Sequence, residues 1–134
     1  MYQGEVHHVG VVVPDEAQVQ TWIDLFGLEM GRRQYVPEYE ALCLFTRGPR
    51  GLIEFIVPGG GVLAAFNKGN GGLHHVAFEV ADLAAETRRL ADQGGTLLEP
   101  EPVRAGPLLI NFMSPVYTRG VAVELVQTIE PDTA

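Results

Sequence analysis

Two residue types that bind metals recur at matching places in this chain. A His-His-Val triplet occurs at 7–9 and again at 74–76. A glutamate twice interrupts an apolar run, as Glu54 in Leu-Ile-Glu-Phe-Ile-Val and as Glu124 in Val-Ala-Val-Glu-Leu-Val. A carboxylate inside such a segment needs a cation, a proton or water, because burying an unpaired charge is costly. Two imidazoles and two carboxylates form a ligand set for a divalent first-row metal ion, with positions left open for water or substrate.

The histidine triplets belong to a longer repeat. Residues 4–15 and 71–82 align without a gap, and the glycine, His-His-Val, a later valine and the aspartate coincide. Each segment is followed by a helical pattern. The repeat predicts two modules, at about 4–58 and 71–128, within one domain spanning 1–134.

Strand alternation selects one histidine from each pair. In the second module His74 shares a face with Val76, Phe78 and Val80, and this apolar face is expected to pack under a helix. His75 lies on the opposite face, and His8 is its counterpart in the first module. We therefore predict His8, Glu54, His75 and Glu124 as metal ligands. His7 and His74 remain the alternative.

Local patterns predict the same order of elements, βαβββ, in both modules. Asp15 and Asp82 are expected to cap the two helices, the first of which buries Val19, Trp22, Ile23 and Phe26 and ends at Gly27. The expected strands are 6–13, 28–36, 41–47 and 52–57 in the first module, and 73–80, 96–99, 108–113 and 121–127 in the second. A glycine-rich connector over 58–72 joins the modules.

Composition narrows the class of partner. Nine basic and seventeen acidic residues give the 134-residue chain a net charge of −8, which argues against nucleic acid or an anionic membrane. The single Cys43 excludes an internal disulfide and a cysteine zinc site. No signal peptide or membrane span is recognisable, so we expect a cytoplasmic protein that binds a small molecule.

Three longer stretches resemble the vicinal oxygen chelate superfamily, which includes glyoxalases, bleomycin resistance proteins and dioxygenases. They are 8–15, 66–80 and 114–127, and the similarity covers nearly the whole chain. Within that superfamily the chain is most similar to the methylmalonyl-CoA epimerases. The stretch 104–115 departs from the epimerase pattern, because it lacks two histidines that are usual there, and the glycine connector is shorter than usual.

The resemblance implies an α+β fold, in which two tandem βαβββ modules form a curved mixed sheet around a metal cleft. It implies a divalent ion (Co, Ni, Mn, Zn or Mg) at His8, Glu54, His75 and Glu124. It also implies an isomerase that moves the C2 proton of a methylmalonyl-CoA-like substrate through an enolate held by the metal. Glu38 then removes the proton and Glu124 returns one to the other face. Glu40 competes with Glu38 for the role of base, and a solvated loop carboxylate is the alternative for Glu38.

Other functions are compatible with the same residues. A glyoxalase I-type lyase or another metal-dependent isomerase of secondary metabolism would use the same four ligands. A drug-sequestering binding protein is the non-enzymatic alternative, although retention of all four ligands counts against it. An acyl-CoA substrate fits poorly with the acidic composition unless arginines form a local patch; the candidates are Arg32, Arg33, Arg47, Arg50 and Arg104. A homodimer is expected from the resemblance.

Overall fold

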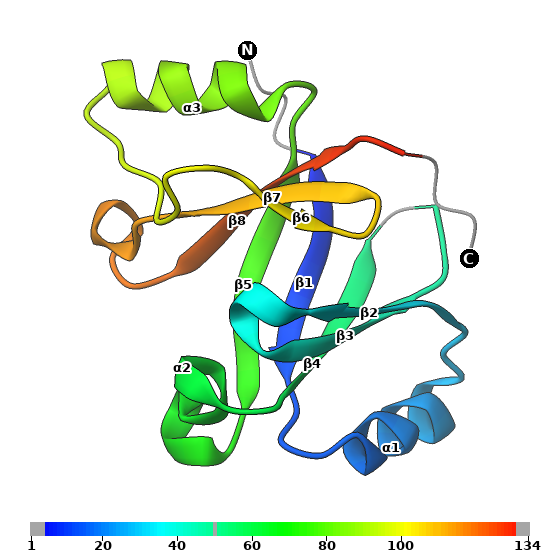
Figure 1. The fold of residues 1–134 in the computed structure, drawn as a ribbon. Coiled ribbons are helices and arrows are strands. Elements are labelled where there is room, and N and C mark those ends of the chain that lie inside the picture. The colour runs from blue at the N-terminus through cyan, green and yellow to red at the C-terminus, as the bar shows by residue number, and fades with distance from the viewer. Residues whose placement is uncertain (1–4, 50, 131–134) are drawn as a thin grey trace. The chain divides into compact units, whose positions relative to one another are not determined.

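The computed structural model describes residues 5–49 and 51–130 (Figure 1). The chain divides into two compact units. The first unit is His8–His74, and the second contains the described chain from His75 onward together with the residues before His8. In the described part of the chain, no helix is long and apolar enough to cross a membrane.

The first unit is a four-stranded mixed sheet with one covering helix. Its strands lie in the order β2-β3-β4-β1, with β1 parallel to β4 and the other neighbours antiparallel. This order places the last strand of the module beside the first. The elements are β1 (Val6–Val12), α1 (Ala17–Phe26), β2 (Met30–Val36), the 3-10 turn η1 (Pro37–Tyr39), β3 (Ala41–Thr46) and β4 (Leu52–Pro58).

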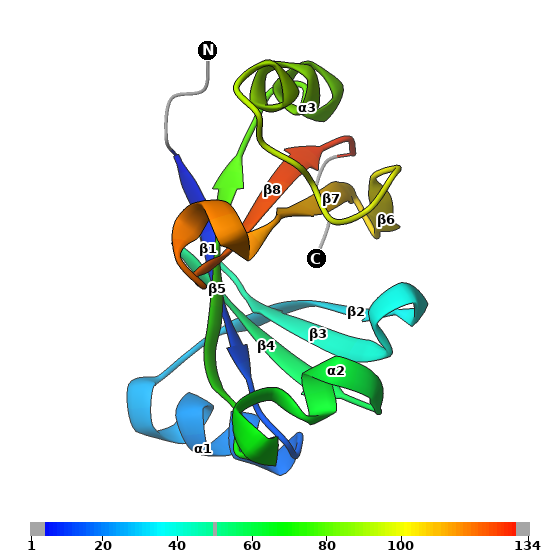
Figure 2. The same cartoon turned by 90° about the vertical axis from the view of Figure 1, so that its left-hand side faces the viewer.

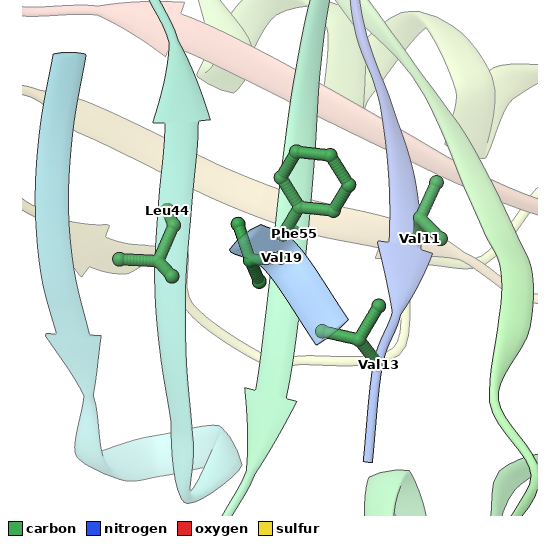
Figure 3. Close-up of a cluster of buried hydrophobic side chains, with 5 residues drawn as sticks. All are labelled: Val11, Val13, Val19, Leu44 and Phe55. Atoms are coloured by element: carbon green, nitrogen blue, oxygen red, sulfur yellow. The ribbon is translucent and has the colours of Figure 1, made fainter. Parts of the chain in front are cut away.

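The helix α1 packs on one face of this sheet. Figure 3 shows Val19 of α1 over Phe55 of β4, with Leu44 on one side and Val11 and Val13 on the other. Asp15 accepts a hydrogen bond from the Ala17 N–H at 2.8 Å, although Glu16 is the residue that directly precedes the helix. Gly27 ends α1 with a φ of 64°, as predicted.

One predicted core position of α1 is wrong. Phe26 is 65% exposed, whereas Val19 is buried and Trp22 and Ile23 are partly buried. Phe26 is the last helical residue, and its ring lies against Trp22 with the centroids 5.8 Å apart. The apolar stripe of α1 therefore ends one turn earlier than its periodicity predicts.

The second unit repeats the arrangement with strands in the order β5-β8-β7-β6, where β5 is parallel to β8. Asp82 caps α3 by accepting a hydrogen bond from the Ala85 N–H. Leu83 and Leu90 of α3 pack against Leu109 and Leu125 of β7 and β8, and Figure 2 shows the helix alongside these strands. The elements are β5 (Gly72–Glu79), α3 (Leu83–Asp92), β6 (Val103–Ala105), β7 (Leu108–Met113), the 3-10 turn η3 (Pro115–Thr118) and β8 (Ala122–Thr128).

The strand predicted over 96–99 is wrong, since the strand that pairs with β7 is β6. The predicted segment still runs along β7 through an isolated bridge between Leu97 and Met113. Prolines at 100 and 102 remove backbone donors and prevent a continuous ladder. The buried side chain of Asn111 replaces the missing pairing, because its amide donates to the Glu99 carbonyl and accepts from the Glu99 N–H.

The connector between the modules contains α2 (Gly61–Ala64) and the 3-10 segment η2 (Phe66–Gly69). It ends at Gly71, which is buried and has a φ of 73°. A Cβ atom at this position would overlap the Val12 carbonyl oxygen and lie 3.0 Å from Pro14 Cδ. Gly71 thus permits the connector to pass directly against the end of β1.

We expect Gly71→Ala to lower the free energy of unfolding by about 3 kcal/mol, because the new methyl group meets fixed backbone and the φ is unfavourable. Gly27→Ala is the matched control, because its φ is 64° and a Cβ atom added there would meet nothing within 4 Å. The control should lose only about 1 kcal/mol. Urea unfolding measures both variants, and equal losses would contradict this explanation.

Candidate metal centre

The first unit holds a buried pair, His8 and Glu54. His8 is 1% exposed, and its Nε2 lies 3.2 Å from Glu54 Oε1. In the parallel ladder, Gly10 pairs with Glu54 and His8 stands two residues earlier on β1. Since paired residues point to the same face, both side chains lie on the face opposite to α1.

The second unit reproduces the pair with His75 and Glu124. The distance from His75 Nε2 to Glu124 Oε1 is again 3.2 Å, and both side chains are buried. Ala77 pairs with Glu124, so it occupies the place of Gly10. Strand pairing in both modules thus follows the same register.

A phenylalanine completes each set. Phe45 pairs with Glu54 on β3, and Phe112 pairs with Glu124 on β7. The ring of Phe45 meets His8 edge to face at 5.2 Å and 87°. Phe112 meets His75 at 5.3 Å and 87°. Each imidazole therefore contacts an aromatic ring on the antiparallel strand that lies next to the strand of its glutamate.

These phenylalanines are not among the candidate site residues predicted above. The alignment of residues 4–15 with 71–82, continued along the chain without a gap, places Phe45 on Phe112, and this coincidence was the available signal. It does not bring the glutamates together, because the two phenylalanines stand at different sequence distances from them. Strand pairing in the structure places each phenylalanine directly beside its glutamate.

The donor chemistry of the pairs suits a metal ion. Among the described residues the buried glutamates are Glu54, Glu86 and Glu124. Glu86 accepts hydrogen bonds from Arg89, and this interaction raises the pKa of Arg89 above its usual range. Glu54 and Glu124 face imidazole nitrogens instead. His8, Glu54, His75 and Glu124 form a group of His and Glu side chains that could hold a metal ion.

The predicted alternatives for the histidines lie in different surroundings. His7 and His74 are partly buried, whereas His8 and His75 are buried. His74 packs edge to face on Phe66 of the connector, with the ring centroids 4.9 Å apart. The selection of His8 and His75 as the ligands stays a prediction.

The two candidate bases differ in their contacts. Glu38 lies in η1 and is exposed. Glu40 ends η1 with a φ of 49°, and its carbonyl accepts a hydrogen bond from the Gly59 N–H at 2.7 Å. The Glu40 carboxylate lies against the connector, since a Cβ on Gly61 would stand 2.7 Å from its Oε2.

Residues 7–112 match the Glyoxalase/Bleomycin resistance protein/Dioxygenase superfamily. The ethylmalonyl-CoA/methylmalonyl-CoA epimerase of Cereibacter sphaeroides is 33% identical over 92% of this chain and 98% of its own length. The mitochondrial methylmalonyl-CoA epimerase of Bos taurus is 30% identical over 92% of this chain and 74% of its own length. Epimerases are isomerases.

Solved structures give the same relationship. The methylmalonyl-CoA epimerase of Mycobacterium tuberculosis has a TM-score of 0.87 at 28% identity, over 95% of this chain and 89% of that one. A variant of the Streptomyces coelicolor enzyme in complex with 2-nitronate-propionyl-CoA has a TM-score of 0.84 at 26% identity, over 94% and 98%. The predicted vicinal oxygen chelate fold is confirmed.

We expect Phe45→Leu and Phe112→Leu each to weaken the binding of Co²⁺ about three- to tenfold, because an edge-to-face contact is worth about 0.5–1.5 kcal/mol beyond the area that it buries. Chelator competition gives the affinity, and the d–d absorption bands report ligand geometry. Glu124→Ala serves as the reference for a lost ligand.

Phe66→Leu is the matched control for this experiment, since Phe66 contacts His74 rather than His75. It should leave the affinity for Co²⁺ unchanged. A loss equal to that of Phe112→Leu would indicate that His74 is a ligand and would contradict the assignment.

Proposed function

Because the chain belongs to the Glyoxalase/Bleomycin resistance protein/Dioxygenase superfamily, we propose that it is a metal-dependent epimerase of a methylmalonyl-CoA-like thioester. The carrying observation is the duplicated His–Glu pair, in which an aromatic ring contacts each imidazole. Relatives that match nearly the whole chain are named epimerases, and this supports the choice of reaction. A cytoplasmic location, a single-domain organisation and a homodimer stay predictions.

In this proposal His8, Glu54, His75 and Glu124 share one divalent ion. Two neutral imidazoles and two carboxylates balance the charge of such an ion and leave positions for substrate oxygens. Once bound, the ion would polarise the carboxylate and thioester oxygens and so acidify the carbon between them. Its identity is not specified by this donor set.

The protein's own groups then move the proton. Epimerisation needs a base on one face of a planar enolate and an acid on the other. We assign removal to Glu38 and return to Glu124, with the reverse order for the other epimer. Glu40 is the weaker candidate because its carboxylate lies against Gly61 in the connector. Glu124 would act both as ligand and as acid or base.

We expect metal-dependent deuterium incorporation at C2 when the protein meets (2R)- or (2S)-methylmalonyl-CoA in deuterated water. Dialysis against a chelator should abolish the exchange, and a divalent ion should restore it. Mass spectrometry of the recovered thioester measures the exchange. Absence of exchange with each of Co²⁺, Ni²⁺, Mn²⁺, Zn²⁺ and Mg²⁺ would contradict the proposal.

The glyoxalase I-type alternative uses the same four ligands and is tested in parallel. Isomerisation of the methylglyoxal–glutathione hemithioacetal by the metal-loaded protein would favour it over the epimerase.

We expect Glu38→Gln to lower kcat by about 10²- to 10⁴-fold, which is the usual contribution of a general base. The KM for methylmalonyl-CoA and the metal content should change little. Glu40→Gln is the matched control, two residues along the same turn, and should retain activity within a few-fold. If Glu40→Gln is the inactive variant instead, Glu40 and not Glu38 is the general base.

A further inference from the structure

A β-bulge in β2 brings Arg32 onto the face that carries His8 and Glu54. Met30 pairs with Thr46 and Arg33 pairs with Leu44, so β2 holds one residue more than β3 over this interval. Bulges redirect side chains and are frequent beside active sites. Here the Arg32 guanidinium stacks on Phe45, with its carbon 4.3 Å from the ring centroid.

This stacking places a cation close to the metal ligands. Phe45 pairs with Glu54 and contacts His8 at 5.2 Å. The Arg32 guanidinium carbon lies 4.3 Å from the centre of the Phe45 ring, and that centre lies 5.2 Å from the centre of the His8 ring. The distance from the Arg32 carbon to the His8 ring centre therefore cannot exceed the sum of these two distances. A stacked guanidinium is held in one orientation. Its N–H donors lie in the plane of the group and point away from the aromatic ring that it covers.

The position of Arg32 selects the part of the substrate that it meets. In a CoA thioester the phosphates are separated from the acyl group by the long pantetheine arm, whereas the free carboxylate is attached directly to the reacting carbon. A substrate whose oxygens reach the His8 and Glu54 side chains brings its carboxylate, not its phosphates, within range of Arg32.

Building on the proposed function, we propose that Arg32 is a specificity-determining residue that binds the free carboxylate of the substrate. A guanidinium hydrogen-bonds a carboxylate oxygen more strongly than a neutral donor does. The contact would hold the carboxylate in the plane required for the enolate. It would also give an acidic protein, with a net charge of −8, a fixed local cation for an anionic substrate.

Equilibrium binding tests this assignment with two thioesters that differ in the carboxylate. Methylmalonyl-CoA carries it, and propionyl-CoA has hydrogen in its place. For Arg32→Gln we expect calorimetry to show a Kd for methylmalonyl-CoA raised about 10- to 100-fold, as for a lost charge-assisted hydrogen bond, and an unchanged Kd for propionyl-CoA. Arg32→Lys keeps the charge but loses the planar guanidinium with its paired N–H donors. Its Kd for methylmalonyl-CoA should lie between those of the wild type and Arg32→Gln.

Arg33→Gln is the matched control. Arg33 is the next residue, but it pairs with Leu44 and its guanidinium bonds Glu16 at 2.9 Å on the exposed surface. It should bind both thioesters as the wild type does. Metal content and melting temperature are measured for every variant.

Three results would overturn the role of Arg32: equal weakening for both thioesters, no weakening for either, or loss of metal from both Arg32 variants. The proposed function fails separately, when the wild-type protein shows no C2 exchange. In that case the carboxylate-dependent difference in binding still reports on Arg32.

Discussion

The strongest physical constraint on this structure is the burial of two glutamate carboxylates in the middle of apolar strands. Glu54 is flanked by Ile53 and Phe55, and Glu124 by Val123 and Leu125. Such positions are stable only where another charge or a hydrogen bond compensates the lost hydration. In each module the compensation begins with an imidazole 3.2 Å away. His8, Glu54, His75 and Glu124 form a group that could hold a metal ion.

The strand order makes this arrangement possible. Because the last strand of each module lies parallel to the first, a histidine on one strand meets a glutamate in the middle of the other. Small residues, Gly10 and Ala77, occupy the positions paired with the two glutamates. In each module the helix, α1 or α3, covers the other face of the sheet, so the hydrophobic core and the His–Glu pair lie on different sides of the same strands.

Much of the fold and of the candidate site could be predicted from the sequence. Repetition and strand alternation are visible without knowing how distant strands pair. The two-residue period of a strand places His8 and His75 on the other face from His7 and His74, and the structure buries both of them. The cap at Asp82 follows from local chemistry as well, whereas α1 begins after Glu16 and not after the predicted Asp15. The parts that depend on pairing between distant segments were not predictable: Phe45 and Phe112 beside the glutamates, and the displaced strand β6.

The bulge at Arg32 is another feature that depends on strand pairing and could not be predicted from the sequence. Simple alternation from Met30 would place Arg32 on the face that α1 covers, but the extra residue in β2 places it on the face of Phe45 instead. The second module is built differently beside its phenylalanine. There the backbone N–H of Leu98 donates to the Phe112 carbonyl, and Asn111 holds the segment in place.

This difference between the modules has a chemical consequence. Two identical half-sites can bind an ion, but a substrate with a carboxylate at one end and a thioester at the other presents two different oxygens to it. Discrimination between those ends requires a group that occurs on one side only. Arg32 and Glu38 both belong to β2 and the turn that follows it, so the first module carries the asymmetric groups. In the proposed function, duplication would supply the ligands, and divergence of the edge strand β2 would supply the recognition of the substrate.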